Sequence, residues 1–286
     1  MIKRFFKAIG LIFVFGISLG SLYLVNLFFM KPISIDHYLG KEVILGLLDS
    51  PESMTYMGVF DEYNWITKHN SSLSIPKYED LEEGINDAKK SLDILTSYKD
   101  SSLTNNQKIT KRIAMFDIEN GLRQSEFFPY HDYPLNQVRG IHHSIISFMS
   151  DMHPVRNHDE AKDFIKRTDL AKDVYAGVLD GLQRQAAAGI FAPEFVYAHV
   201  IEQLNEMINY SFDEHPLYTQ FMKKAELLEI SEEELASLES QLILSIENSV
   251  TPGFTLLRDF MVSTEASANP HHGIWSQPNG DDFYKL

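Results

Sequence analysis

A long uncharged run near the N-terminus constrains this chain more than any other sequence feature. Lys3, Arg4 and Lys7 precede a stretch without charge from Ala8 to Met30. A helix needs about 20 apolar residues to cross the hydrocarbon core of a bilayer. Basic residues before such a helix keep its N-terminus in the cytoplasm. The sequence therefore predicts contact with a membrane through residues 8–30, with the remainder of the chain outside the cytoplasm.

A cleavable signal peptide is the alternative interpretation of this run. Signal peptides have an apolar region of about 7–15 residues, and Ser18-Leu19-Gly20 offers a small-residue cleavage site. However, the segment from Leu22 to Met30 stays apolar apart from Asn26, which favours an uncleaved anchor. We therefore predict a signal anchor over residues 1–32 and a single-pass topology, with secretion after cleavage as the alternative.

Composition limits the classes of partner. The net charge is −15, from 40 acidic against 25 basic residues, so we expect no nucleic-acid partner, because phosphate binding requires a basic surface. The chain has no Cys, which excludes disulfides, thiolate zinc ligands, Cys nucleophiles and a lipid anchor attached to Cys. The acidic residues are best explained as a solvated surface.

The remainder of the chain reads as helices, and we predict an all-α fold with residues 33–286 as one multi-helix extracytoplasmic domain. Cap residues followed three positions later by Glu or Gln mark helix starts, as do residues directly before Pro. These signals occur at Thr104/Gln107, Asn157/Glu160 and Ser231/Glu234, and at Ser50-Pro51, Ala192-Pro193 and Thr251-Pro252. No segment alternates long enough to be a convincing strand.

Apolar residues at helical spacing identify the candidate core. They form three stripes, over Ile109, Ile113, Phe116 and Ile118, over Phe195, Val196, Val200, Leu204, Met207 and Ile208, and over Leu235, Leu238, Leu242 and Ile246. We expect each stripe to face the interior of the domain.

Eleven His residues raise the question of a zinc site, but their spacing does not support one. Two zinc-binding His residues on one helix normally lie four positions apart, and no His pair in this chain has that spacing. His199 and Glu202 share a helix face, but no third ligand can be identified. Because His199 falls beside Phe195 and Val196, we expect it to be a packed core residue. We therefore expect residues 33–286 to hold no stoichiometric zinc.

Two segments are unusually rich in residues that require a fixed environment. Tyr133-Pro134-Leu135-Asn136-Gln137-x-x-Gly140 opens an apolar helix, and its Asn and Gln could cap backbone groups or reach a ligand. Gly273-x-Trp275-x-x-Pro278-Asn279-Gly280 and Tyr284 end the chain with side chains that normally seek burial. Because natural termini are usually polar, we interpret the chain as a fragment, the front part of a longer polypeptide that is incomplete at its C-terminal end.

The first segment resembles the Pro-x-x-Gln-x-x-Gly motif of the bacterial domain-of-unknown-function 885 family, a group of exported, helical, zinc-metallopeptidase-like proteins. The terminal segment is similar to that family's Gly-x-Trp-x-x-Pro-x-Gly-x-x-Tyr motif. Further matches follow in the same order along the chain, at Pro51, Glu52, Thr55 and Gly58, at Glu160, Ala161, Phe164, Lys166 and Arg167, at Gln185, Gly189, Ile190 and Pro193, and from Val250 to Phe254 with Leu257 and Phe260. The resemblance covers residues 51–284.

The departure from the family is as informative as the match. The resemblance implies a His-Glu zinc motif followed by Pro-Gly-His-His downstream of the Trp/Pro/Gly segment, and nothing in this chain matches it. No catalytic or metal-binding residue can therefore be placed here, and no cofactor is expected in this chain. A full-length form would bind zinc, whose activated water attacks a peptide substrate with Glu as the base.

We therefore predict a protein that is anchored in a bacterial cell membrane, with its C-terminal domain in the periplasm or outside the cell. It resembles the front half of a zinc-dependent peptidase, and we expect it to be inactive alone. The alternative is a non-catalytic binding or structural ectodomain. The family-motif positions, whose role is unknown, are Tyr133, Pro134, Asn136, Gln137, Gly140, Gly273, Trp275, Pro278, Asn279, Gly280 and Tyr284.

Overall fold

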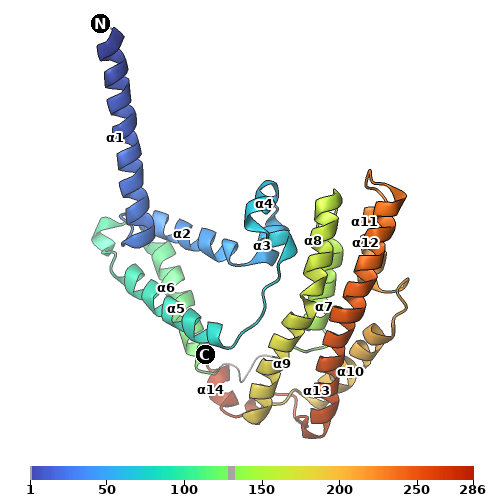
Figure 1. The fold of residues 1–286 in the computed structure, drawn as a ribbon. Helices are drawn as coiled ribbons and strands as arrows, with labels where there is room; N and C mark the ends of the chain where they lie inside the picture. Colours follow the sequence, from blue (N-terminus) through green and yellow to red (C-terminus); the bar gives the residue numbers. More distant parts are fainter. Residues whose placement is uncertain (1, 128–132) are drawn as a thin grey trace. The chain divides into compact units, whose positions relative to one another are not determined.

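The computed structural model describes residues 2–127 and 133–286, without the side chains of residues 2–6 and 8. Throughout these described ranges the secondary structure is helical, with one isolated bridge between Pro193 and Asn269 and no strand (Figure 1). The α-helices are α1 (Ile2–Phe29), α2 (Ile35–Leu48), α3 (Pro51–Met57), α4 (Asn64–Thr67), α5 (Glu79–Thr96), α6 (Asn105–Ser125), α7 (Ile141–Ser147), α8 (His158–Asp169), α9 (Ala171–Ala187), α10 (Glu194–Asn209), α11 (Pro216–Ala225), α12 (Glu232–Ser245), α13 (Thr251–Thr264) and α14 (Gly280–Tyr284). The all-α prediction is confirmed.

Short helical turns complete the fold. The 3-10 turns are η1 (Asp61–Tyr63), η2 (His69–Ser71), η3 (Asp100–Ser102), η6 (Glu265–Ser267) and η7 (Ile274–Ser276), and the π-helical turns are η4 (Phe148–Met152) and η5 (Ile246–Val250). The chain divides into two compact units. The first contains Met1–Leu47 and Asn86–Leu122, and the second contains Leu48–Ile85 and Arg123–Leu286.

The first unit joins the apolar helix α1 to a small helical core. Within α1, the span Ile9–Phe29 is long and apolar enough to cross a membrane, and none of its most apolar window is buried. The core of this unit is made by Ile35 and Tyr38 of α2 together with Leu95 of α5 and Tyr98, which follows the end of α5. This core is small: four side chains are buried, and a few partly buried side chains of α2, α5 and α6 pack against them.

The second unit has a larger core that is built by the bundle α8–α13. Helix α13 packs against α9 and α10, and α12 packs against α8. Aromatic rings fill the centre. Phe164 lies 5.0 Å from Phe221, and Tyr175 lies 5.1 Å from Phe254, both measured between ring centroids. Burial of such side chains is the main stabilising term for a bundle of this kind.

The helix starts follow the predicted caps closely. Ser231 and Glu234 form a complete capping box, in which each side chain accepts from the other residue's backbone N–H. The same reciprocal pair occurs at Thr104 and Gln107. Asn157 caps α8, because its side chain accepts from the backbone N–H of Glu160. The Glu160 carboxylate accepts from the backbone N–H of Arg156 rather than from that of Asn157, so the capping box is not complete. Ser50 caps α3 ahead of Pro51.

Two predicted helix starts differ in detail. Pro193 is the cap of α10 rather than its first residue. Helix α13 begins at Thr251 as predicted, but it follows α12 and the π-helical turn η5 without a break in helical backbone. A π turn before Pro252 is physically reasonable, because proline has no N–H to donate within a regular α-helix.

One of the three predicted core stripes is wrong. Ile109, Ile113 and Phe116 of α6 are 49%, 57% and 60% exposed, and only Ile118 packs against the core of the first unit. The other two stripes are confirmed in their main members, since Val200, Leu204, Leu238 and Leu242 are all buried. Phe195, at the edge of its stripe, remains 41% exposed. Helical spacing identifies a shared face but not what covers it.

Candidate functional site

Asn136 organises the loop that enters α7. Its side-chain Oδ1 accepts from the backbone N–H groups of Val138 and Arg139 at 3.0 and 2.7 Å, and its Nδ2 donates to the carbonyl of Tyr133 at 3.0 Å. The carbonyl of Pro134 accepts from the backbone N–H of Ile141 at 2.9 Å. Asn136 therefore performs the capping role that its position predicts.

Gly140 closes this loop because no other residue fits there. A Cβ atom at this position would lie 2.3 Å from the His142 ring and 2.6 Å from the carbonyl oxygen of Asn136. The His142 ring is fully buried, with Nε2 at 3.1 Å from Oε1 of Gln203, and Gln203 in turn donates to the carbonyl of Gln137. Burial lowers the pKa of His142 to about 4, so the ring is neutral at pH 7 and donates from Nε2.

The terminal segment is also built on glycines. A Cβ at Gly280 would lie 1.8 Å from the carbonyl oxygen of Ile274, and one at Gly273 would meet the Trp275 ring at 2.2 Å. Asn279 adopts the left-handed conformation, with φ of 58°, which Asn tolerates better than most residues. The aromatic side chains of this segment are largely uncovered: Trp275 is 61% exposed and Tyr284 is 81% exposed, although Phe283 contacts Phe127.

Gln277 brings the two motif segments together. Its side chain is buried and donates from Nε2 to the hydroxyl oxygen of Tyr133 at 2.9 Å and to the carbonyl of Phe191 at 2.6 Å. Asn269 makes the second attachment, because its backbone exchanges hydrogen bonds with Ala192 and Glu194. We call the contacts of Gln277 and Asn269 with the 191–194 turn and Tyr133 the terminal clasp. Burial raises the pKa of the Tyr133 hydroxyl, which therefore stays protonated.

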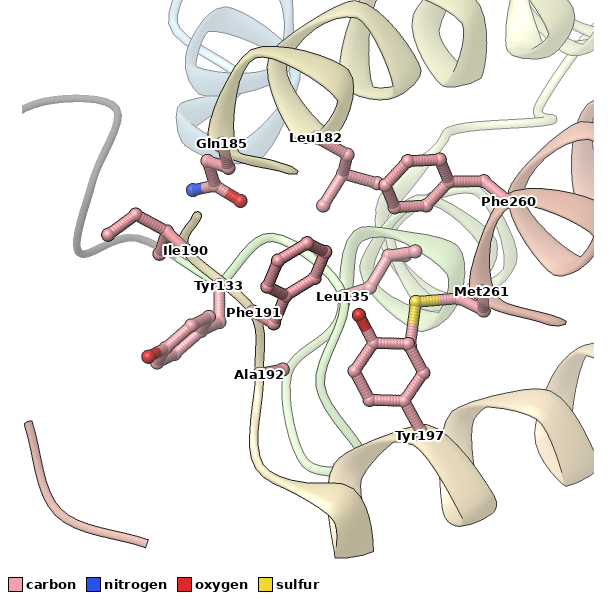
Figure 2. Close-up of a pocket in the computed structure, with 10 residues that line it drawn as sticks. All are labelled: Tyr133, Leu135, Leu182, Gln185, Ile190, Phe191, Ala192, Tyr197, Phe260 and Met261. Atoms are coloured by element: carbon pink, nitrogen blue, oxygen red, sulfur yellow. The ribbon is translucent and has the colours of Figure 1, made fainter. Parts of the chain in front are cut away.

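A small cavity lies beside the terminal clasp, and side chains from the family-motif segments line it (Figure 2). Tyr133 and Phe191 reach it from loops, Gln185 from α9, and Tyr197 and Phe260 from α10 and α13. Its volume is about 20 Å³, which suits a single water molecule among polar partners. The motif residues therefore meet around a packed, water-sized space, with no room for a peptide.

Replacing Gln277 with Ala is expected to release the terminal segment. The partly buried carbonyl of Phe191 would lose its partner, and an unsatisfied buried acceptor typically costs about 1–3 kcal/mol. Hydrogen exchange of the full chain in detergent should show faster exchange across residues 269–284 and little change in α8. Gln241→Ala is the matched control, since its amide bonds only within its own helix. Equal exchange in both variants would show that Gln277 does not hold this segment.

A buried cation forms the second polar centre of this unit. Arg167 of α8 is fully buried. Its Nε donates to the carbonyl of Ser72 at 2.8 Å. Its Nη2 donates to Thr55 Oγ1 at 2.9 Å and to the carbonyl of His69. Its guanidinium also lies over the Phe148 ring at 5.1 Å. Burial lowers the pKa of Arg167 to about 10, so it remains charged at neutral pH.

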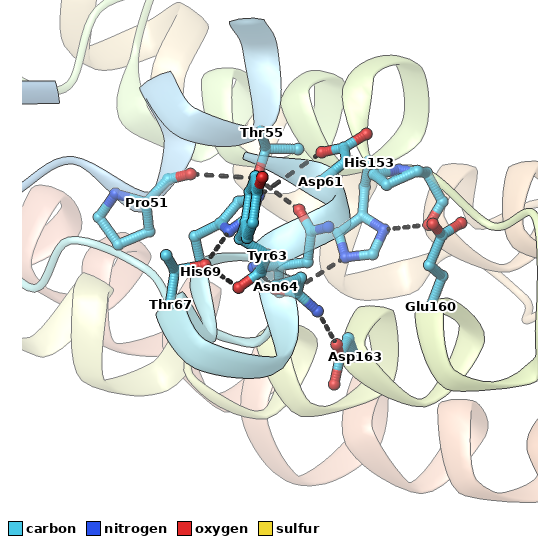
Figure 3. Close-up of polar contacts among 12 residues, drawn as sticks. Pro51, Thr55, Asp61, Tyr63, Asn64, Thr67, His69, His153, Glu160 and Asp163 are labelled. Carbon is cyan, nitrogen blue, oxygen red and sulfur yellow. Dashed lines mark hydrogen bonds and ion pairs between the residues drawn. The ribbon is translucent and has the colours of Figure 1, made fainter. Parts of the chain in front are cut away.

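The partners of Arg167 are themselves connected (Figure 3). Thr55 donates to Oδ1 of Asn70 at 2.8 Å, and Asn64 links the backbone N–H of Asn70 to the carboxylate of Asp163. His153 places Nε2 at 2.9 Å from the carbonyl of Asn70. We call these residues, with Arg167 and His69, the Arg167 network. It joins the opening motif around Thr55 to the motif on α8.

Two His residues of the Arg167 network are fully or almost fully buried. Burial and the neighbouring positive charge of Arg167 lower the pKa of His153 to about 3. Burial also lowers the pKa of His69. The carboxylate of Asp61, which lies 3.6 Å from Nε2 of His69, raises this pKa but does not outweigh burial. Asp61 also pairs with Arg156 at 2.7 Å. Both rings are therefore held neutral in a site that already carries a buried cation.

The residues considered for zinc do not fit a zinc site. His199 is exposed on α10, so its predicted core position is wrong, and Glu202 is exposed as well. Within residues 2–127 and 133–286, no three His, Asp, Glu or Cys side chains gather closely enough to hold a metal ion. The exposure of His199 has a simple cause. Val196 and Val200 point into the bundle, and position 199 lies about a quarter of a turn away from the midline of the face that they share.

A larger apolar cleft lies between the loop 73–76 and helices α7 and α9. Its volume is about 400 Å³, within the range of small-molecule sites. Apolar side chains line it, namely Leu73, Pro76, Ile141, Ile145, Phe148 and Val174. Glu52 is the one acidic side chain among the lining residues, and its two oxygens accept from the backbone N–H and the hydroxyl of Ser74 at 2.7 Å. We call this space the Glu52 cleft.

Sequence reasoning missed three of these groups. Gln277 lies inside a recognised motif but at one of its variable positions, and only the fold shows its contacts. The motif on α8 includes Arg167 but assigns it no role, although an Arg with apolar neighbours on a helix face is a signal of burial. The opening motif includes Glu52 and likewise assigns it no role.

Comparison with known proteins identifies relatives of this chain. The family model described as "Bacterial protein of unknown function (DUF885)" matches residues 51–286. A solved structure described as "the putative lipoprotein from Colwellia psychrerythraea" superposes with a TM-score of 0.71 at 18% sequence identity. That superposition covers 84% of this chain and 45% of the other chain, so this chain spans less than half of the length of its solved relative. No curated protein matches the chain.

Proposed function

Because the chain belongs to the DUF885 family of bacterial proteins of unknown function, we propose that it is a membrane-anchored, extracytoplasmic helical protein whose second unit offers the Glu52 cleft to a ligand. The observation that carries the proposal is α1. Its span Ile9–Phe29 is apolar and unburied, and the described part of the protein offers no cover for it. A bilayer would provide that cover.

The solved relative supports attachment to a membrane, since a lipoprotein is held there by a lipid. This chain has no Cys to carry such a lipid. An uncleaved α1 would serve the same purpose by a different physical means, because a spanning helix is held more firmly than a single acyl chain. The basic residues Lys3, Arg4 and Lys7 favour a cytoplasmic N-terminus.

The activity of the whole protein is a further proposal. The resemblance to zinc-metallopeptidase-like proteins, together with the greater length of the solved relative, supports a role for this chain as the front half of such an enzyme. The Glu52 cleft would then receive an apolar side chain of a peptide. No step of the reaction is assigned to residues of this chain, because the described residues do not fit a zinc site.

A non-catalytic binding ectodomain is the second candidate. It is favoured by the Glu52 cleft, which is large enough for a ligand and contains one carboxylate among apolar side chains. Both candidates predict that this chain alone holds no zinc, and metal analysis of the purified full chain tests that shared prediction. We expect less than stoichiometric zinc and no peptide hydrolysis. One tightly bound zinc per chain that is lost in a His199→Ala variant would contradict both the spacing argument and this expectation.

The proposed topology predicts the behaviour of reporter fusions. Alkaline phosphatase fused after Leu286 should be active, because this enzyme folds only outside the cytoplasm. Green fluorescent protein fused at the same place should not fluoresce after export through the general secretion route. The chain should stay with washed membranes after carbonate extraction. Release of a soluble protein with a new N-terminus near Ser21 would contradict the anchor and support a cleaved signal peptide.

A further inference from the structure

Helix α2 follows the proposed anchor almost immediately and carries unusual apolar exposure. Only residues 30–34 separate α1 from α2. Val43, Ile44 and Leu45, in the second half of α2, are 71%, 54% and 43% exposed, and no charged residue occurs from Val43 to Leu48. In a water-soluble helix, such a run is normally covered by other parts of the protein.

The junction between the two helices is fixed by side chains, so their relative placement within the first unit is defined. Asn26 donates to the carbonyl of Lys31 at 2.9 Å and accepts from the backbone N–H of Ile33 at 3.1 Å. Lys31 donates to the carbonyl of Ser97 at 3.0 Å, and the Tyr98 hydroxyl donates to the carbonyl of Pro32 at 2.6 Å. The end of the anchor is therefore fastened to the same helical core that holds α2.

One ring contact identifies the face of α2 that is turned toward α1. His37 of α2 packs edge-on against Tyr23 of α1, with 5.4 Å between ring centroids. Tyr23 lies within the apolar span, so this face of α2 is turned back along the anchor. Residues seven positions apart share a helix face, which places Ile44 on the same face as His37. The opposite face carries Ile35, which is buried in the core of the first unit.

We propose that α2 lies in the plane of the membrane and inserts its exposed apolar side chains, with Ile44 at the centre, into the interface of the outer leaflet. This inference rests on the proposed anchor, because α1 in the bilayer brings α2 to the surface from which α1 emerges. Helices that lie in the plane of the interface bury apolar side chains about 5–10 Å into the headgroup and acyl boundary. The occupant of this face is therefore lipid.

The absence of Cys from the sequence makes the proposal directly measurable, because single-cysteine variants can be spin-labelled without background. Three variants of the full chain in phospholipid vesicles are sufficient. Val14→Cys reports on the anchor, Ile44→Cys on the face of α2, and Lys89→Cys on an exposed polar position of α5 in the same unit. Collisions with oxygen, which concentrates in lipid, are compared with collisions with a water-soluble nickel chelate.

At Ile44 we expect the oxygen collision rate to exceed the nickel rate, as at Val14, and the ratio to be reversed at Lys89. Low collision rates with both reagents at Ile44 would show cover by protein, and a high nickel rate would show exposure to water. Either result would overturn the proposal. If Val14 also collides mainly with nickel, the anchor itself is refuted, so failure of the proposed function and failure of this inference give different patterns.

Discussion

Replacing Arg167 with Ala is expected to destabilise the second unit strongly. The change leaves the carbonyl of Ser72 without its donor and removes one of the two donors to the carbonyl of His69, which still accepts from the backbone N–H of Ser72. It also empties the volume of a fully buried side chain. Leaving a buried acceptor without a hydrogen bond typically costs about 1–3 kcal/mol, and large-to-small changes in cores typically cost about 2–5 kcal/mol. Unfolding of the full chain in detergent, followed by circular dichroism against denaturant, measures the loss.

Two further variants make this result specific. Arg184→Ala removes an exposed guanidinium from α9 that pairs with Asp180 four residues earlier, and we expect little change, because exposed pairs contribute little. Arg167→Lys keeps the charge but loses the planar set of donors that reaches three partners. We expect it to lie between the wild type and Arg167→Ala. If Arg167→Ala unfolds at the same midpoint as Arg184→Ala, the Arg167 network does not stabilise the fold.

Acidification from pH 7 to pH 4 is expected to destabilise the protein strongly through buried His residues. Burial lowers the pKa of both His142 and His215 from 6.5 to about 4 in the folded state. Because the unfolded chain then binds more protons, the stability that these rings confer is complete above about pH 6.5 and is lost as the pH falls toward 4. Each ring contributes about 3 kcal/mol to this loss at pH 4.

Substitutions that cannot titrate provide the check. His215 caps α11 by accepting from the backbone N–H of Leu217, so His215→Asn keeps a capping acceptor and removes the titration. His142→Gln removes the second titration while retaining a polar group near Gln203. The unfolding free energy of each variant should fall less than that of the wild type between pH 7 and pH 4. Parallel pH profiles for all three proteins would contradict the assignment of the acid sensitivity to these rings.

Local features of the fold could be predicted from sequence because they depend on neighbouring residues. A cap and its partner lie three positions apart, so Ser231 and Glu234 identify the start of α12 without tertiary information. The same holds for α1, whose apolar length is a property of one continuous segment. The ordered motifs from residue 51 onward likewise indicated the family that the comparison shows.

The candidate site could not be predicted in the same way, because its contacts join residues that are distant in sequence. Gln277 reaches Tyr133 and Phe191, and Arg167 reaches Thr55 and Ser72. These contacts exist only after the bundle has formed. Gly140 illustrates the same limit. The sequence identifies it as a motif position, but only the structure shows that the His142 ring leaves no room for a side chain there.

The sequence by itself determined the helical class, the positions of the capped helix ends, the long apolar N-terminal helix and the family. Each of these depends on a local pattern, which acts through backbone geometry or side-chain periodicity within one segment. Only the tertiary structure decided which apolar faces are covered, which is why Ile109 and Ile113 are exposed while Leu238 and Leu242 are buried. Burial depends on what packs against a face, and the partner of a helix is set by the whole chain rather than by the helix itself.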